Sequence, residues 1–145
     1  MTAIGEVTIT EEGGKITKLN WGAARNPQIT QLLREARSQL SAYLKGDRRD
    51  FDLPLAPQGT TFQKAVWQSM REIPYGRTQS YGDLAKKLKS GARAVGGASS
   101  RNPIPIFIPC HRVLAAHGGL GGYSAKGGVK TKRRLLALEN INPVP

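Results

Sequence analysis

The chain has 145 residues, which is enough for one domain of ordinary size or for a small unit packed on a larger one. Its hydrophobic content of 39% is adequate for a core, and no apolar run approaches the roughly 20 residues that a membrane helix needs. The N-terminus lacks a basic region followed by an apolar one, and the single cysteine cannot form an internal disulfide. We therefore expect a cytoplasmic, reducing location and no membrane partner.

Charge is unevenly distributed along the chain. The 22 Lys and Arg residues outnumber the 10 Asp and Glu residues. Residues 1–55 hold 8 basic and 7 acidic side chains, whereas residues 56–145 hold 14 and 3. A one-sided basic unit is typical of a protein that binds a polyanion, nucleic acid before membrane. An ordinary solvated surface is the alternative explanation.

The first third of the chain predicts an α/β unit. Residues 4–22 indicate a β-hairpin, because Val7 and Ile9 alternate with polar residues ahead of a Gly-Gly turn. Apolar residues at helical spacing, from Ile29 to Tyr43 and Leu44, then predict a helix that Pro27 opens and Gly46 ends. The sequence indicates no chemistry in this unit.

A polar, proline-rich stretch over residues 47–59 predicts a boundary between two units, a small α/β unit over 1–55 and a basic unit over 56–145. Helical periodicity in the second unit predicts helices from Thr61 to Ile73, from Ser80 to Leu88, from Ala92 to Ser100 and from Val129 to Asn140. Thr61 is expected to cap the first of these, and Ser80 to begin the second with Asp83 as its capping-box partner. Two helices joined by a Gly-containing turn at Ser90-Gly91, inside a basic unit, are typical of a helix-turn-helix.

The helix over 92–100 consists almost entirely of small residues. Gly96 and Gly97 each cost about 1 kcal/mol relative to alanine in a helix, so close approach of another backbone is expected to compensate. Flanking elements or a DNA strand could fill that place. Arg93 is the only long side chain before Arg101, so we expect weak sequence readout.

The segment from Asn102 to Val113 carries the only cysteine, Cys110, followed directly by His111. Isoleucines alternate at period two before it, and three prolines stiffen it. This pattern predicts an extended ribbon with one buried face. A lone cysteine is more often a small core residue, so the thiol alone identifies no site.

Glu139 gives that thiol possible chemistry. It shares the inner side of the last helix with Leu135 and Leu136, and a carboxylate near a helix C-terminus opposes the macrodipole, so we expect it to have a partner. A thiol with a pKa of about 8.5 becomes a better nucleophile when an imidazole, oriented by a carboxylate, lies in reach. On an extended ribbon, His111 would need a water or a turn at Cys110 to reach the sulfur. A cysteine hydrolase would use the same three groups.

A glycine-rich stretch over 115–128 holds Tyr123 and Ser124. It predicts a loop that closes over a ligand or a flexible connector.

These motifs together resemble the catalytic domain of the O6-alkylguanine-DNA alkyltransferases, the methylated-DNA–protein-cysteine methyltransferases. The resemblance covers residues 61–140 and rests on Tyr81-Gly82, Arg93-Ala94-Val95-Gly96-Gly97-Ala98, Asn102-Pro103, Pro109-Cys110-His111-Arg112-Val113, Gly122-Tyr123-Ser124, and Leu135-Leu136 with Glu139. The fold class it implies is an α/β N-terminal subdomain plus a mainly α C-terminal helix-turn-helix, winged-helix-like, DNA-binding catalytic domain.

The resemblance also implies roles for these residues. Cys110 would accept the alkyl group of O6-alkylguanine, with O4-alkylthymine as a second substrate, while His111 acts as a base through a water and Glu139 orients it. The remaining roles are implied for Asn102 in holding the segment, Tyr81 in donating to guanine N3, Tyr123 and Ser124 in holding O6, the Val113 carbonyl in binding the exocyclic amine, and Arg93, Ala94, Gly97 and Tyr81 in binding DNA.

The partner implied is double-stranded DNA whose damaged base is flipped out, with Arg93 filling the gap. The resemblance implies a monomer without cofactor or metal that reacts once, because no second thiol is present to accept the group. Ser99 stands where the family's pattern suggests a larger apolar residue. The rival interpretations are a cysteine hydrolase, a non-catalytic helix-turn-helix regulator, and a lesion-binding protein whose thiol is idle.

Overall fold

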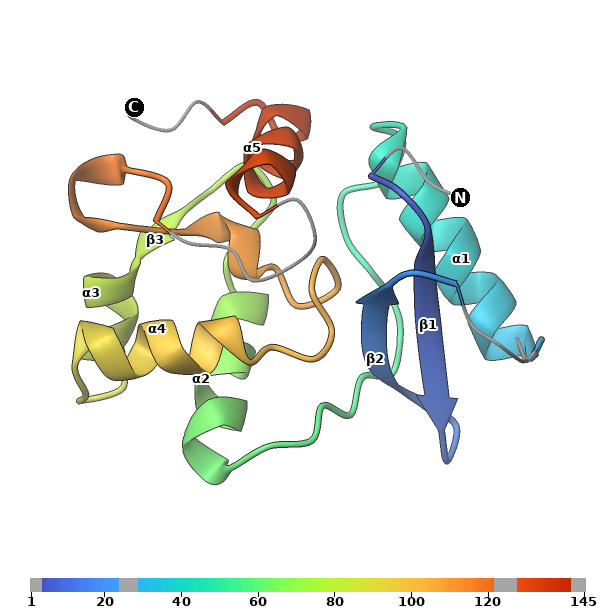
Figure 1. Ribbon diagram of the computed structural model, residues 1–145, viewed down its shortest axis with the longest axis horizontal. Coiled ribbons are helices and arrows are strands. Elements are labelled where there is room, and N and C mark those ends of the chain that lie inside the picture. Colours follow the sequence, from blue (N-terminus) through green and yellow to red (C-terminus); the bar gives the residue numbers. More distant parts are fainter. Residues whose placement is uncertain (1–3, 24–28, 122–127, 142–145) are drawn as a thin grey trace.

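The computed structural model describes residues 4–23, 29–121 and 128–141. A hairpin with one helix lies beside a cluster of helices (Figure 1), which confirms the predicted fold class. The elements in chain order are β1 (Val7–Glu12), β2 (Lys15–Trp21), α1 (Gln31–Leu44), α2 (Thr61–Arg71), β3 (Gln79–Ser80), α3 (Tyr81–Lys87), α4 (Ala92–Ser100), a 3-10 turn (Cys110–Arg112), β4 (Val113–Leu114), a second 3-10 turn (Ala116–Gly118) and α5 (Val129–Leu138).

The predicted hairpin is present, with β1 antiparallel to β2 and a register shift between Thr10 and Glu11. Helix α1 starts later than expected. Pro27 lies outside the described residues, and the helix begins at Gln31 behind Thr30, whose hydroxyl accepts a hydrogen bond from the Leu33 amide at 3.1 Å. Ile29 was expected on the inner face but precedes this cap and is 71% exposed.

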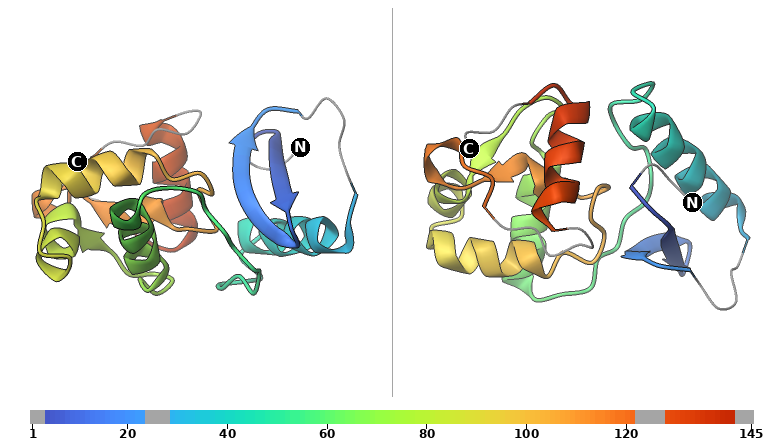
Figure 2. Two further views of the ribbon diagram at one scale, coloured as in Figure 1. Left: turned by 90° about the horizontal axis from the view of Figure 1, so that it is seen from below. Right: turned by 45° about the horizontal axis from the view of Figure 1, so that its top comes forward.

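The C-terminal helices follow the sequence signals closely. Ser80 caps α3 in a capping box with Asp83, as predicted, and α4 has the predicted bounds. The cap of α2 is Thr60 and not Thr61, because Thr60 forms the capping box with Gln63. Helices α3 and α4 pack together as a helix-turn-helix, and in all views α3 lies far from α1 (Figure 2).

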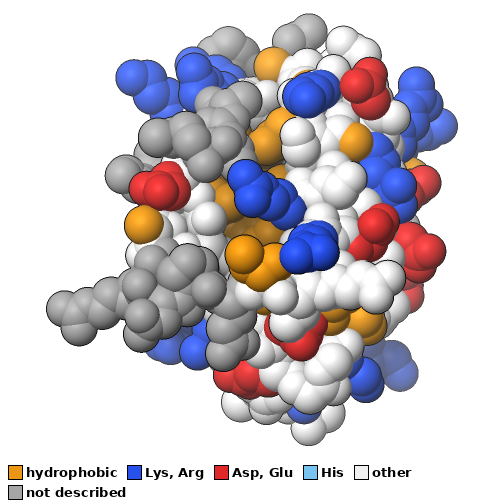
Figure 3. All heavy atoms as spheres, turned by 90° about the vertical axis from the view of Figure 1, so that its right-hand side faces the viewer, with side chains coloured by type: hydrophobic (Ala, Val, Ile, Leu, Met, Phe, Trp, Pro, Cys, Tyr) orange, Lys and Arg blue, Asp and Glu red, His pale blue; other side chains and the backbone are white. Residues whose placement is uncertain are grey.

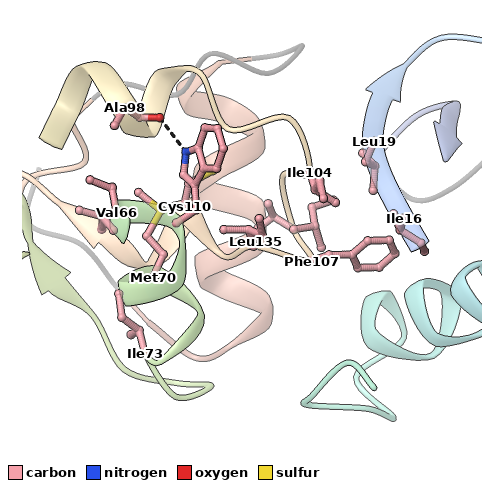
Figure 4. Close-up of a cluster of buried hydrophobic side chains, with 14 of the residues drawn as sticks. Ile16, Leu19, Val66, Met70, Ile73, Ala98, Ile104, Phe107, Cys110 and Leu135 are labelled. Atoms are coloured by element: carbon pink, nitrogen blue, oxygen red, sulfur yellow. Dashed lines mark hydrogen bonds between the residues drawn. The ribbon is translucent and has the colours of Figure 1, made fainter. Parts of the chain in front are cut away.

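A single hydrophobic core joins the hairpin side to the helical side. The amide of Leu19 in β2 donates to the Pro103 carbonyl at 2.9 Å, which ties the hairpin to the segment before Cys110. Figure 4 shows Ile104 and Phe107 between the hairpin residues and Leu135 of α5. The segment that carries the cysteine is therefore packed between the two groups of elements.

Figure 3 shows the face of the hairpin side, where Lys and Arg side chains are interspersed with Asp and Glu. This mixture agrees with the nearly balanced charge of residues 1–55. The excess positive charge belongs to the helical side. Among the described residues, no helix combines the length and the apolar character needed to cross a membrane.

Candidate active site

The segment before Cys110 is a folded loop, so the prediction of an extended, half-buried ribbon is wrong. The Asn102 side chain closes the loop: its amide donates to the Ile108 carbonyl at 3.0 Å, and its oxygen accepts from the Ile104 amide at 3.0 Å. Ile106 adopts a positive φ of 76° at the turn. The prediction from the period-two spacing failed because the hairpin covers one side of the loop and α5 covers the other (Figure 4). Residues 104–114 are all buried.

A turn then places Cys110 and His111. Residues Cys110–Arg112 form a 3-10 turn, closed by the Arg112 amide donating to the Pro109 carbonyl at 3.0 Å. Neighbouring side chains in such a turn do not alternate between opposite faces, as they would on a strand. The turn at Cys110 that the sequence argument considered is therefore present. Cys110 itself is 7% exposed.

His111 and Glu139 form a fully buried pair. Nε2 of His111 lies 2.7 Å from Oε2 of Glu139, and both side chains are 0% exposed. Glu139 is the C-cap of α5, so the end of the last helix delivers the carboxylate. The inward-facing acid expected from the sequence thus has partners.

The protonation of the pair follows from its surroundings. Burial lowers the pKa of His111, against the opposing effect of the Glu139 charge, so the imidazole is neutral at neutral pH. Burial alone would raise the pKa of Glu139, but hydrogen bonds from His111, Arg112 and the Gly76 amide outweigh it and hold this pKa at about 2. An ionised carboxylate only accepts, so Nε2 carries the proton and Nδ1 has a lone pair. Nδ1 is buried and hydrogen-bonds to no described residue.

Arg112 is a site residue that the sequence argument missed. Its Nε lies 2.9 Å from Oε1 of Glu139 and its Nη2 lies 3.1 Å from Oε2, while Nη1 donates to the Ile73 carbonyl at 2.7 Å. The guanidinium thus neutralises the charge of the buried carboxylate and links it to the backbone just after α2. The only available signal was the position of Arg112 beside His111, and arginine is usually exposed.

Lys132 is a second missed residue, and it lies close to the thiol. Its side chain is 0% exposed, and Nζ donates to the carbonyls of Val113 at 2.7 Å and Leu120 at 2.5 Å. Burial lowers its pKa to about 8, against the opposing electrostatic effect of Cys110. In the sequence it is one of several basic residues of α5, whose other members are exposed, so charge patterning gave no reason to single it out.

Tyr81, the first residue of α3, also faces the thiol. Burial raises the pKa of Tyr81, the charge of Cys110 adds to this, and a hydrogen bond with Ser99 opposes it. The phenol is therefore a neutral donor at neutral pH. Tyr81 explains why position 121, in the loop after Cys110, is a glycine. A Cβ there would lie 3.1 Å from Cε2 of Tyr81. The small side chain of Ser99 is a hydrogen-bond partner of Tyr81.

Other predicted residues have definite places or lie outside the described part. Val113 begins β4, which pairs with β3 in parallel, and its carbonyl accepts from Lys132. Tyr123 and Ser124 lie outside the described residues. The described residues contain no group of three or more His, Cys, Asp or Glu that could hold a metal ion.

The outer face of α4 is bare. Arg93, Ala94 and Gly97 are exposed, and a Cβ built at Gly96 or Gly97 meets no described atom within 4 Å. Of the two reasons considered for these glycines, close packing by flanking elements is therefore ruled out within the described structure. The other reason, an outside partner that approaches the α4 backbone, stays a prediction.

A helix-turn-helix, followed by a buried thiol beside an imidazole–carboxylate pair, is typical of a DNA-binding protein with a potential cysteine nucleophile. Comparison with known proteins identifies the family. The model for the 6-O-methylguanine DNA methyltransferase DNA binding domain matches residues 61–141, and the model for the ribonuclease-like domain of the same proteins matches residues 1–57. The chain belongs to the 6-O-methylguanine DNA methyltransferase family.

Individual relatives agree with this assignment. The constitutive methylated-DNA–protein-cysteine methyltransferase of Bacillus subtilis is 42% identical over 156 residues, covering 97% of this chain and 93% of the relative. A methylated-DNA–protein-cysteine methyltransferase of Methanosarcina acetivorans is 50% identical over 111 residues, covering 75% and 70%. The crystal structure of Mycobacterium tuberculosis OGT in complex with DNA matches with a TM-score of 0.86 and 40% identity, covering 96% of this chain and 89% of that one.

Proposed function

We propose that this protein repairs DNA by transferring an alkyl group from O6 of guanine to the sulfur of its own Cys110. The names of its relatives and the DNA complex among them support DNA as the partner and methyl transfer to cysteine as the reaction. O4-alkylthymine is proposed as a second substrate. A monomer that acts in the cytoplasm, divided into units over 1–55 and 56–145, stays a prediction.

One observation supports the chemical proposal: Nδ1 of the neutral, buried His111, in the turn that starts at Cys110, has no hydrogen-bond partner among the described residues. Glu139 accepts a hydrogen bond from Nε2–H and so fixes the tautomer that leaves Nδ1 basic. Nδ1 can then accept the thiol proton, directly or through a water. The carboxylate stabilises the imidazolium that results.

The transfer step balances as a single displacement. The thiolate attacks the alkyl carbon, the S–C bond forms, and the C–O6 bond breaks with its electron pair going to the base. Tyr81 lies beside the thiol as a neutral donor and stabilises the negative charge that builds on the leaving base. The thiol loses one proton and the guanine released from its alkyl group gains one, so the products are guanine and a thioether.

The roles of the remaining site residues follow from their places. Asn102 fixes the loop that presents Cys110. The Val113 carbonyl keeps one lone pair for the exocyclic amine of guanine after it accepts from Lys132. Tyr123 and Ser124 are proposed to hold O6.

DNA is proposed to lie against the bare face of α4. The small residues let a minor groove approach, and Arg93 fills the place of a base that is flipped toward Cys110. Binding through phosphates and without long base-reading side chains is expected to be salt-sensitive and largely independent of sequence.

A mass measurement tests the proposal. The protein is mixed with a short duplex that carries one O6-methylguanine, and its intact mass is recorded over time. We expect one methyl increment that saturates at one per chain, maps to Cys110 and is absent in Cys110→Ala, since the chain has no second thiol to receive the group. An excess of repaired duplex over protein would contradict the single turnover. Lesion-selective binding with no change in mass would identify a damage sensor instead.

The glycines of α4 allow a separate prediction about DNA binding. Gly97→Leu is expected to raise the free energy of unfolding by about 0.5–1 kcal/mol, because leucine favours a helix and the position is open. The same change is expected to weaken duplex binding at least about tenfold by holding the groove away from the helix. Chemical denaturation and fluorescence anisotropy measure the two effects.

Ala137→Leu is the matched control, because Ala137 is an exposed residue of α5. It adds similar bulk on another helix and is expected to leave duplex affinity unchanged. Wild-type affinity in Gly97→Leu would place the DNA on another face of the protein.

A further inference from the structure

Tyr43 connects the hairpin side of the protein to the buried His111–Glu139 pair. It belongs to α1, in the part of the chain where the sequence showed no chemistry, and it is 0% exposed. Its hydroxyl donates a short hydrogen bond to Oε2 of Glu139 and lies 3.3 Å from Nε2 of His111. The phenol thus touches both members of the pair.

We propose that Tyr43 is a positioning residue for alkyl transfer, which sets the orientation and the basicity of His111 through Glu139. This inference rests on the proposed function of the site. It makes α1 a working part of the reaction, in addition to its place in the core.

The hydrogen bonds around Glu139 indicate what Tyr43 adds. Oε1 accepts from the Gly76 amide at 3.0 Å and from Arg112 at 2.9 Å. Oε2 is the oxygen that faces His111, and Tyr43 and Arg112 both donate to it as well. Tyr43 therefore neutralises part of the charge on Oε2, the oxygen that is hydrogen-bonded to the imidazole of His111.

The phenol keeps its proton over the working pH range. Burial raises the pKa of Tyr43, and the negative charge of Glu139 raises it further. Tyr43 is thus a permanent donor to Glu139 and not a proton carrier. A permanent donor lowers the pull of the carboxylate on the proton of His111, which keeps the pKa of the base low.

The ring of Tyr43 is held in place by aromatic neighbours. Its centroid lies 5.2 Å from that of Phe51 and 6.1 Å from that of Tyr75, and Phe51 in turn lies 4.7 Å from Phe107 in the loop before Cys110. These contacts fix the hydroxyl relative to the cysteine loop. The position of α1 is therefore coupled to the geometry of the site.

Tyr43→Phe tests the proposal, because it removes the hydroxyl and keeps the ring. Without the donor, Glu139 attracts the proton of His111 more strongly, so the pKa of the base rises. We expect the acidic limb of the pH–rate profile to move to higher pH and the rate constant at saturating lesion DNA to fall roughly tenfold at neutral pH, in line with the loss of one hydrogen bond to a charged group. The affinity for DNA is expected to stay unchanged.

Tyr75→Phe is the matched control. Its hydroxyl is partly buried and donates to the Leu138 carbonyl at 3.1 Å and not to Glu139. The control should lose a hydrogen bond without moving the pH profile. An equal effect of both variants, or no effect of Tyr43→Phe, would overturn the positioning role.

A second measurement does not depend on DNA or turnover. NMR titration of His111 in wild type and Tyr43→Phe reports the pKa of the base directly, with His117, the other histidine of the chain, as an internal reference. We expect the value for His111 to be higher in the variant. If wild type transfers no methyl group, the proposed function fails, yet this titration still decides whether Tyr43 controls His111. If methyl transfer occurs and neither readout changes in the variant, the inference alone fails.

Discussion

Glu139→Gln should unfold the protein at a temperature lower by on the order of 10 °C. The change keeps the shape of the side chain but leaves the buried Arg112 guanidinium without its counter-charge. Breaking one partner out of a buried ion pair costs about 3–5 kcal/mol, and a chain of this size loses a few degrees of melting temperature per kcal/mol. The methyl-transfer rate should also fall by at least about 100-fold, because the orientation of His111 is lost. Calorimetry and single-turnover kinetics measure the two effects.

Acid provides a further test of this prediction. Because the pKa of Glu139 is lowered from 4.5 to about 2 in the folded protein, its stabilising contribution is complete above pH 4.5 and is lost as the pH falls toward 2. The difference in melting temperature between wild type and Glu139→Gln should therefore shrink over this range. A constant difference would mean that the charge of Glu139 is not what stabilises the fold.

Glu72→Gln is the matched control for Glu139→Gln. Glu72 also pairs with a basic residue, Lys87 at 2.6 Å, but both side chains are about half exposed. Surface pairs of this kind contribute little, so stability and methyl transfer should both remain close to wild type.

Lys132→Met should slow the alkylation of Cys110 by about tenfold at neutral pH. A cation beside a sulfur favours the thiolate, and the loss of nucleophilicity in a stabilised thiolate offsets only part of the gain. Because the pKa of Lys132 is about 8, the ammonium is lost above that pH. The advantage of wild type over the variant should therefore be largest below pH 8 and disappear above it.

Iodoacetamide labelling followed by mass spectrometry measures this effect without DNA, since Cys110 is the only thiol. Lys130→Met is the control, because Lys130 is an exposed lysine of the same helix. It should react like wild type at every pH. A slow reaction in Lys132→Met that persists above pH 8 would point to loss of the two carbonyl contacts of Nζ and not to loss of its charge.

Local signals in the sequence predicted the helical side well. Ser80 and Asp83 form the expected capping box, and α4 has the expected bounds, because caps and turns depend on residues a few positions apart. Glu139 could be singled out for a similar reason. Its position on the apolar side of a helix end is unfavourable unless a partner is present.

Long-range contacts were beyond the reach of such patterns. Tyr43, Arg112 and Lys132 reach the site through contacts with residues distant in sequence. Helical spacing marked Tyr43 as part of an apolar helix face but indicated no partner for its hydroxyl, and nothing along the chain marks Arg112 or Lys132 as buried. Arg112 and Lys132 belong to residue types that are usually exposed.

The prediction for the loop before Cys110 failed for a different reason. Alternating isoleucines predict one buried face only if water covers the other face. The hairpin on one side and α5 on the other bury both faces, so the alternation carried no information about the backbone. Ile106 at a positive φ shows how far that backbone departs from a strand.

The order of the site residues along the chain has a consequence for synthesis on the ribosome. Tyr43 of α1 is made before Cys110, whereas Lys132 and Glu139 belong to α5 and are made after it. Until α5 docks, the thiol lacks both the ammonium beside it and the carboxylate that orients His111. We therefore expect a nucleophile proposed to work only once to gain its full reactivity only after α5 has been made.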